Sequence, residues 1–276
     1  FIGNAFIFQN HLYISEQRNH RILKINFPNR EVIHQWGINN EVGQTDGRLW
    51  APQMTILNNE LYIVMCKASR ICIYKVLSNN SISLFWGMPL FSKSLFSFPR
   101  ACSYSEQNKM LAVCDTYHNR ICLFDSIGRL RKIIDSREGM PILWPRCVVW
   151  VEDQLVATDS TKNKLLFFTS NGEYLYSIDL SEIISTKEWI QSVSFRNDTL
   201  LIAYEKFVVI ISVERKSILF NSSSLIEMND VHQALFLQDG SVLVADTGNN
   251  RLVIFRNNQV NIITQIPYNG VKKRLK

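Results

Sequence analysis

Long apolar runs, C-x-x-C motifs and glycine-rich loops are all missing from this 276-residue sequence. Without an apolar stretch of about 18 residues, no membrane-spanning helix is expected, and therefore no membrane partner. Only 11 residues are glycine, and the chain contains neither a G-x-S-x-G nucleophile motif nor a glycine-rich phosphate-binding loop. The six cysteines occur in apolar, strand-like stretches, so we expect buried free thiols in a reducing compartment rather than disulfides or a metal site.

A strong overall charge is also missing. The chain has 30 basic and 24 acidic side chains, which give a formal charge of +6. Four of the basic residues lie in the last five positions, namely Lys272, Lys273, Arg274 and Lys276. Without them, 26 basic residues face 24 acidic ones. An anionic partner would therefore need basic side chains gathered on one face of the molecule.

Five segments repeat one pattern, in which an apolar strand and a short polar loop precede a basic residue that opens a second apolar strand. The segments are 12–25, 61–74, 111–124, 155–168 and 243–255, and their basic residues are Arg21, Arg70, Arg120, Lys164 and Arg251. A sixth, degenerate copy at 200–213 has its loop shortened to a tight Glu205–Lys206 turn. The period of the repeat is therefore about 46 residues, which is typical of an array of small β-sheets.

Each repeat also carries one more strand before this pair and another after it, so four short strands recur in every unit. No helical periodicity of useful length separates them, which argues against an α/β solenoid. The sequence therefore predicts an all-β, six-bladed propeller with four antiparallel strands per blade. We expect it to span 1–268, with blades at roughly 1–37, 38–87, 88–135, 136–180, 181–220 and 221–268 and a basic tail at 269–276. Because the sequence begins with Phe1 rather than Met, we expect a domain of a longer chain.

The loop of the repeat follows the pattern D-x-x-N-x-R-I-x-hydrophobic-F. The closest copies are Asp246, Asn249, Arg251 and Phe255 in the last unit and Asp115, Arg120, Ile121 and Phe124 in the third. In the first unit, residues 19–22 read Asn-His-Arg-Ile. This pattern resembles the NHL repeat, and the resemblance covers nearly the whole chain. The fifth unit departs from it completely.

An acid precedes the basic residue by five positions in four of the units, and across a tight loop the two side chains can meet as a cross-strand ion pair. The pairs are Glu16–Arg21, Asp115–Arg120, Asp159–Lys164 and Asp246–Arg251. We expect them to brace the blades. The second unit has Met65 at the acid position, so Arg70, beside Lys67, is available either for an external anion such as a phosphate or for an acid of a neighbouring blade.

One further position, at the start of the innermost strand, would surround the mouth of the central channel. Its six residues are Asn4, Gln53, Arg100, Arg146, Gln191 and His232. None of them is an acid, whereas a calcium site needs several carboxylate or carbonyl oxygens. The five histidines are not arranged as a set of zinc ligands. We therefore expect no cofactor, no metal and no catalytic activity in this domain.

Similarity to the TRIM-NHL group implies a cytoplasmic RNA-binding module that represses translation of the bound message. It also implies that any ubiquitin-ligase activity would lie in domains upstream. Its implied partners are single-stranded or hairpin RNA, such as an mRNA 3′ untranslated region, and protein co-repressors. The candidate RNA-binding residues are Asn4, Arg18, Gln53, Lys67, Arg70, Arg100, Tyr117, His118, Arg146, Lys162 and His232. Lys and Arg would position phosphates, while Tyr117 and His118 would stack on unpaired bases. The candidates predict an off-centre footprint on blades one to four.

The alternative function is a protein-interaction platform without RNA binding, which the small charge of the body favours. RNA binding needs basic loops that are contiguous on one face with few intervening acids. A protein-binding site would instead expose a mixed or apolar patch. The distribution of charged side chains over the surface of the folded molecule therefore discriminates between the two functions.

Overall fold

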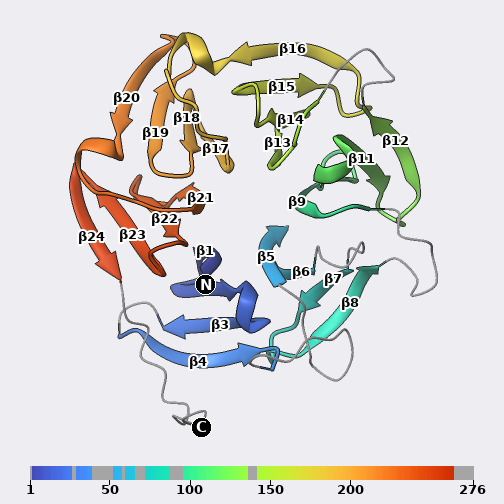
Figure 1. Cartoon of the computed structure of the whole chain (residues 1–276). Helices are drawn as coiled ribbons and strands as arrows, with labels where there is room; N and C mark the ends of the chain where they lie inside the picture. Colours follow the sequence, from blue (N-terminus) through green and yellow to red (C-terminus); the bar gives the residue numbers. More distant parts are fainter. Residues whose placement is uncertain are drawn as a thin grey trace, which may run out of the picture.

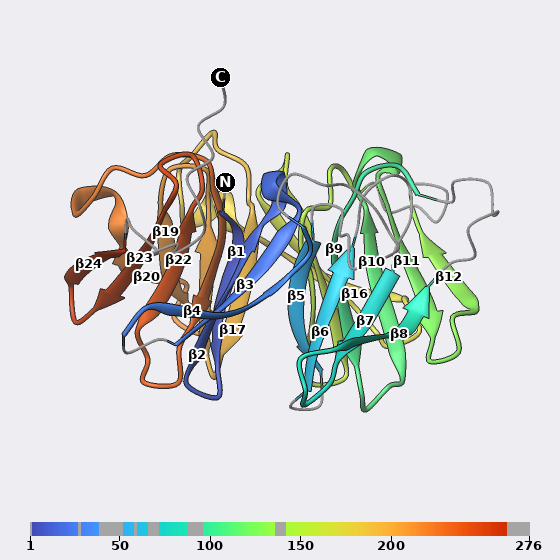
Figure 2. The same cartoon turned by 90° about the horizontal axis from the view of Figure 1, so that it is seen from below.

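The computed structural model describes residues 2–26, 29–38, 52–57, 60–65, 72–87, 96–135 and 142–263. Within these ranges, strands β1 to β24 form six four-stranded antiparallel sheets, each made of consecutive strands (Figure 1). The sheets are arranged around a common axis, and the strands run between two opposite faces of the ring (Figure 2). The prediction of an all-β propeller with four antiparallel strands per blade is confirmed.

The blades are numbered here in chain order. Blade 1 contains β1 (Ile2–Phe8), β2 (His11–Glu16), β3 (Arg21–Asn26) and β4 (Glu31–Trp36). Blade 2 contains β5 (Pro52–Leu57), β6 (Glu60–Met65), β7 (Cys72–Val76) and β8 (Ile82–Gly87). Blade 3 contains β9 (Pro99–Ser105), β10 (Met110–Asp115), β11 (Arg120–Asp125) and β12 (Leu130–Ile134).

The second half of the chain repeats this arrangement. Blade 4 contains β13 (Val148–Val151), β14 (Gln154–Asp159), β15 (Lys164–Phe168) and β16 (Tyr174–Asp179). Blade 5 contains β17 (Ser192–Arg196), β18 (Thr199–Ala203), β19 (Val208–Ser212) and β20 (Ser217–Asn221). Blade 6 contains β21 (Val231–Phe236), β22 (Val242–Asp246), β23 (Arg251–Arg256) and β24 (Gln259–Ile263). The short 3-10 turns are η1 (Gln17–Asn19), η2 (Thr116–His118), η4 (Leu180–Glu182) and η5 (Ser222–Ser224).

The hydrophobic core lies between neighbouring blades. Val156 and Leu165 of blade 4 pack in one cluster with Leu200 and Ile202 of blade 5, and equivalent clusters join blades 3 and 4 and blades 6 and 1. The middle strands of blades 1, 3, 4, 5 and 6 are covered on both sides, so they read as continuous apolar runs rather than as an alternating pattern. Burial of each such side chain contributes about 1.5–3 kcal/mol, so the repeated strands supply most of the stability.

The ring closes through contacts between blades 6 and 1. Thr247 Oγ1 donates a hydrogen bond to the carbonyl oxygen of Ile2 at 2.5 Å, and the amide of Ala5 donates to Gln233 Oε1 at 3.0 Å. Thr116 Oγ1 makes the equivalent bond to Pro145, at 2.7 Å, between blades 3 and 4. The threonine that follows the loop aspartate thus ties its blade to the next one.

The second-to-third strand loops lie at the same end of the propeller as the starts of the first strands. Ile2 pairs with Glu16, Pro99 with Asp115, and Val231 with Asp246. We call this end the loop face. Its loops comprise residues 17–20, 116–119, 160–163, 204–207 and 247–250. No helix in the described part of the chain is long and apolar enough to span a membrane.

Candidate functional site

The acid–base pairs of the repeat face each other across the loop in three of the blades. Arg21 Nε donates to Glu16 Oε2, Arg120 Nε donates to Asp115 Oδ2 at 2.7 Å, and Arg251 Nε donates to Asp246 Oδ2 at 2.6 Å. In each pair the two residues are also backbone partners in the sheet. These ion pairs brace the loops, as the sequence predicts.

Blade 4 differs from this expectation. Asp159 and Lys164 are register partners, but Lys164 Nζ lies 2.8 Å from Asp179 Oδ2 on the neighbouring strand β16. Asp159 instead accepts hydrogen bonds from Thr161 Oγ1 at 3.1 Å and from the Lys162 amide at 3.2 Å. A lysine has a single charged nitrogen on a flexible side chain, so Lys164 pairs with the better-placed of two nearby acids, which is Asp179.

The buried loop aspartates also hold the segment that leads into the first strand. Asp115 Oδ1 accepts the amide of Ser97 at 2.6 Å, and Asp246 Oδ1 accepts the amide of Asn229 at 2.8 Å. The residues that follow these two amides, Phe98 and Asp230, have φ angles of 52° and 47°. Trp144, at the equivalent place in blade 4, has a φ of 50°. Left-handed backbone is costly for bulky residues, so the aspartates secure a strained turn on the loop face.

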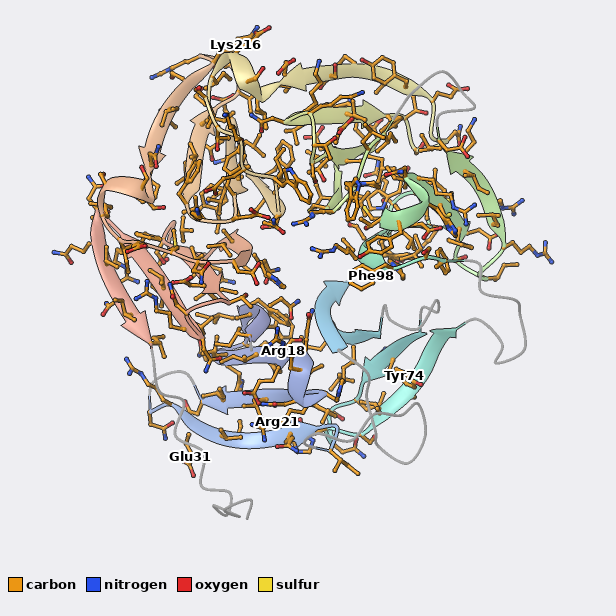
Figure 3. The ribbon with its side chains drawn as sticks, in the orientation of Figure 1. Arg18, Arg21, Glu31, Tyr74, Phe98 and Lys216 are labelled. Atoms are coloured by element: carbon orange, nitrogen blue, oxygen red, sulfur yellow. The ribbon has the colours of Figure 1, made fainter. Side chains whose placement is uncertain are left out.

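Four aromatic side chains form a continuous row across the loop face from blade 3 to blade 5. Phe98 stacks on Tyr117 with ring centroids 4.8 Å apart, Tyr117 lies 5.0 Å from Trp144, and Trp144 lies 5.7 Å from Trp189. Tyr117 is 52% exposed and Phe98 and Trp189 are each 37% exposed, so the row offers ring surface to a ligand. Figure 3 shows Phe98 beside the centre of the ring, whereas Lys216 lies on the outer rim. We call this feature the aromatic row.

The aromatic row was missed by the sequence analysis, although a signal for it was present. Phe98, Trp144 and Trp189 each stand two residues before a residue of the channel-mouth position. An aromatic residue at that place in three consecutive repeats would have identified a shared surface. The contribution of Tyr117, which comes from η2, depends on the fold.

Arg146 closes one end of the aromatic row. Its guanidinium carbon lies 4.9 Å from the centroid of the Trp189 ring, and its Nη1 donates to Gln191 Oε1. Its side chain is only 9% exposed, and Glu205 Oε1 lies 3.9 Å from its Nη1. Burial, followed by the charge of Arg100, lowers the pKa of Arg146 to about 10.

Arg100 occupies the equivalent place beside the first ring of the row. Its guanidinium carbon lies 5.4 Å from the centroid of the Phe98 ring. Burial lowers its pKa, while Tyr117, Asp230 and Glu205 act in the opposite direction. The mutual influence of Arg100, Arg146 and Asp230 shows that residues of blades 3, 4 and 6 share one electrostatic environment.

Two acids reach the channel-mouth region although no channel-mouth position is acidic. The side chains of Glu205 and Asp230 are 40% and 49% exposed. Asp230 lies 3.4 Å from His232 Nε2, and this contact, together with weaker effects of Arg100 and Arg146, lowers the pKa of the aspartate. Basic and aromatic side chains therefore gather on blades 3 and 4, and acids on blades 5 and 6.

The remaining channel-mouth candidates have different environments. Asn4 is buried at 8% exposure, and His232 is partly buried beside Asp230. Gln53 lies on β5, but its side chain is outside the described residues. Gln191 is buried and donates through Nε2 to Glu205 Oε1 at 3.1 Å.

The loop candidates that the structure describes are exposed. Arg18 lies in η1, His118 ends η2 with its side chain 47% exposed, and Lys162 has a side chain that is 42% exposed. His118 Nδ1 contacts Asp115 Oδ2 at 2.7 Å, and Lys162 Nζ lies 3.9 Å from Asp159 Oδ2. Both contacts leave part of the side chain at the surface. Lys67 and Arg70 lie outside the described residues.

Metal-binding residues do not cluster in the described ranges, where no group of three or more His, Cys, Asp or Glu could hold an ion. Cys102, Cys114, Cys122 and Cys147 are free thiols. Burial raises the pKa of Cys147 to about 11 and that of Cys122 to about 12, so these thiols are poor nucleophiles at neutral pH.

Comparison with known proteins finds similarity in structure but not in sequence. No family model and no curated protein sequence matches the chain. Among solved structures, virginiamycin B lyase from Staphylococcus aureus aligns with a TM-score of 0.61 and 14% identity, covering 95% of this chain and 83% of that one. A catalytically inactive variant of the same lyase with quinupristin gives the same values. A streptogramin B lyase structure aligns with a TM-score of 0.62 and 13% identity, covering 96% of this chain and 83% of that one. These comparisons place the chain in the β-propeller fold.

The expectation that this domain is not an enzyme is corrected by the same comparison. It rested on the absence of acids from the channel-mouth positions, on histidines that are not arranged as zinc ligands, and on the missing nucleophile and glycine-rich motifs. The similar propellers are named as lyases, so this fold supports catalysis. In addition, two acids reach the loop face from outside the channel-mouth positions, Glu205 from the shortened loop of blade 5 and Asp230 from the turn beside His232. The residue types at one repeated position therefore do not decide whether a propeller is catalytic.

Proposed function

We propose that the loop face binds single-stranded RNA across blades 3 and 4. The observation that carries this proposal is the aromatic row, with Arg100 packed against the ring at one end and Arg146 against the ring at the other. Aromatic side chains that present exposed ring faces bind unpaired bases, at about 1–3 kcal/mol per base. Guanidinium groups beside such rings contact phosphates or base edges.

Exposed polar residues next to the row extend the proposed site. His118 follows Tyr117 in η2, and Lys162 belongs to the next loop along the ring. Both side chains are more than two-fifths exposed, so they are accessible to an RNA strand that runs over blades 3 and 4. Lys162 would contact phosphates and His118 would contribute either a hydrogen bond or a stacking surface.

The NHL-like repeat connects this site to a biological role. We propose that the domain belongs to a cytoplasmic post-transcriptional regulator of the TRIM-NHL type that represses mRNAs through their 3′ untranslated regions. Protein co-repressors would then contact other parts of the propeller.

The experiment is selection from a randomised RNA pool at physiological salt, followed by sequencing of the retained RNA. We expect an enriched single-stranded motif whose binding requires Tyr117 and the two arginines. Absence of enrichment would contradict the proposal. Retention that disappears with moderate salt and persists in the Arg100→Glu/Arg146→Glu variant would also contradict it, because that is the behaviour of non-specific electrostatic binding.

A failed selection would favour a protein-interaction platform. The acids on blades 5 and 6 and the exposed rings of the aromatic row make the loop face a mixed surface, which is the character expected for protein recognition. Binding of protein partners that is lost with Tyr117→Ala, and that RNA does not compete with, would support this alternative.

Lyase activity is a second candidate function, favoured by His232 and Asp230. Their side chains lie 3.4 Å apart on the loop face, an arrangement in which a carboxylate orients an imidazole for proton transfer. Incubation with quinupristin, followed by mass spectrometry, tests this activity, with His232→Ala as the control. Unchanged quinupristin would exclude that substrate.

A further inference from the structure

The guanidinium of Arg146 is buried with an incomplete set of acceptors. Nη1 donates to Gln191 Oε1, while Nε has no hydrogen-bond partner among the described residues. A guanidinium carries five N–H donors, and a buried charged donor that lacks an acceptor costs free energy. An added hydrogen-bond acceptor would therefore stabilise the buried guanidinium of Arg146.

Arg100 increases this demand for an anion. Its Nε also has no partner in the described part of the chain, and its positive charge contributes to the lowered pKa of Arg146. Two partly desolvated guanidiniums that repel each other are both stabilised by a negative charge nearby. Arginine pairs of this kind favour planar or tetrahedral oxyanions.

Glu205 lies near Arg146, but it is poorly placed to serve as its partner. Glu205 Oε1 lies 3.9 Å from Arg146 Nη1, beyond hydrogen-bond distance, and instead accepts from Gln191 Nε2 at 3.1 Å. With 40% of its side chain exposed, Glu205 can turn into solvent at little cost. It comes from the shortened Glu205–Lys206 turn of the degenerate fifth repeat, so this repeat supplies an acid where longer loops supply other residues.

We infer that Arg146 and Gln191 form a subsite for one phosphate group of the bound nucleotide chain, that the charge of Arg100 strengthens the attraction, and that Glu205 competes with this phosphate. The inference rests on the proposed RNA-binding function and deepens it. Displacement of Glu205 frees Gln191 Nε2 to donate to a phosphate oxygen. The Trp189 ring, 4.9 Å from the Arg146 guanidinium, then offers a surface to the attached nucleoside.

The test is a titration of the whole chain with inorganic phosphate, UMP and uridine at constant ionic strength, followed by calorimetry and tryptophan fluorescence. We expect UMP to bind at least about tenfold more tightly than uridine, because only UMP carries the phosphate. Arg146→Gln should remove this difference. Equal affinities for UMP and uridine in the native chain would overturn the inference.

Removal of the Glu205 charge should change UMP affinity in the opposite direction. Glu205→Gln should strengthen UMP binding by about three- to tenfold, because a neutral amide no longer competes for the guanidinium. The matched control is Glu188→Gln, which removes an acid of the same blade that lies 3.9 Å from Lys206 rather than from Arg146. UMP affinity that is equal in Glu205→Gln and in the native chain would contradict the competition, and so would an equal gain in both variants.

The outcomes separate this inference from the proposed function. A selected RNA that is lost with Arg100→Glu/Arg146→Glu but binds equally well to the native chain, Arg146→Gln and Glu205→Gln would contradict the phosphate subsite and leave RNA binding intact. Phosphate-dependent UMP binding without any selected RNA would support the phosphate subsite and contradict RNA binding. Arg146→Lys, which keeps the charge but loses the fork of donors, and thermal melting of every variant distinguish loss of the subsite from loss of the fold.

Discussion

The two halves of the loop face are built from the same repeat but differ in chemistry. On blades 3 and 4 the channel-mouth residues are Arg100 and Arg146, and the residues two positions before them in the sequence are Phe98 and Trp144. On blade 6 the corresponding pair is Asp230 and His232, and on blade 5 the shortened loop brings Glu205 to the same surface. In both halves a buried loop aspartate holds the turn before the first strand through the same backbone hydrogen bond. The exposed side chain at that turn can therefore differ between blades without a change in the backbone.

The arginines of the molecule divide in the same way. Arg120 and Arg251 lie directly against carboxylates with no exposed surface, so their charges are fully paired. Arg100 and Arg146 pack against aromatic rings, and each has an Nε that lacks an acceptor among the described residues. The first pair stabilises the blades, and for the second pair we propose contact with a ligand.

The largest expected effect is on stability and separates these two kinds of arginine. Arg120→Ala leaves the fully buried Asp115 carboxylate without its guanidinium, which should cost about 3 kcal/mol of unfolding free energy. Arg146→Gln should cost less than about 1 kcal/mol, because burial opposes the charge of Arg146. With a pKa lowered to about 10, Arg146 is charged in both folded and unfolded chains at pH 7, so the burial penalty is fully present there and is relieved only above pH 10.

Urea denaturation at pH 7 measures both values. Similar losses in the two variants would mean that Arg146 is also a structural residue, and the division between the two kinds of arginine would be wrong.

The next effect concerns RNA affinity on the basic half of the loop face. Arg100→Glu/Arg146→Glu should weaken binding of a selected RNA by at least about 30-fold, which corresponds to about 2 kcal/mol. The control is Arg129→Glu/Arg215→Glu, with the same change in charge on exposed turns between third and fourth strands, away from the loop face. Fluorescence anisotropy at two salt concentrations measures both. Equal losses would show a general charge effect rather than a site.

Removal of one ring should have a smaller effect. Tyr117→Ala should weaken RNA binding by about five- to tenfold, since one stacked base contributes about 1–3 kcal/mol and neighbouring rings of the row remain. Tyr174→Ala, which removes a 43% exposed tyrosine from the outer strand β16, is the matched control. If both substitutions leave affinity unchanged, the aromatic row is not the binding surface.

The smallest effect is a shift in the titration of Asp230 on the acidic half. His232 lowers the pKa of this carboxyl below its ordinary 3.8, so His232→Gln should raise it. Because the folded pKa is depressed, the stabilising contribution is present above pH 3.8 and is lost as the pH falls through the folded value. Carboxyl-carbon NMR resolves the titration. An unchanged midpoint in the variant would mean that the 3.4 Å contact does not persist in solution.

Much of the scaffold could be predicted from the sequence, because the period of the repeat encodes it. The four-stranded units and the cross-strand pairs such as Asp115–Arg120 follow from local pattern and register. The pairing of Lys164 with Asp179 could not be predicted in the same way, since it depends on which of two nearby acids a flexible side chain reaches. The prediction that the domain is not catalytic was wrong because it relied on the residue types at one repeated position, on the spacing of histidines and on missing motifs, none of which excludes catalysis in this fold.

The sequence by itself determined the propeller, its loops and the identity of its channel-mouth residues, because hydrophobic periodicity and turn residues act over a few positions. Only the tertiary structure brought Phe98, Tyr117, Trp144 and Trp189 into one row, and placed Glu205 of blade 5 beside Arg146 of blade 4. These residues come from different repeats, and their contacts arise only when the inter-blade cores close the ring. Repeats specify their own strands, whereas a surface shared by several blades exists only in the closed propeller.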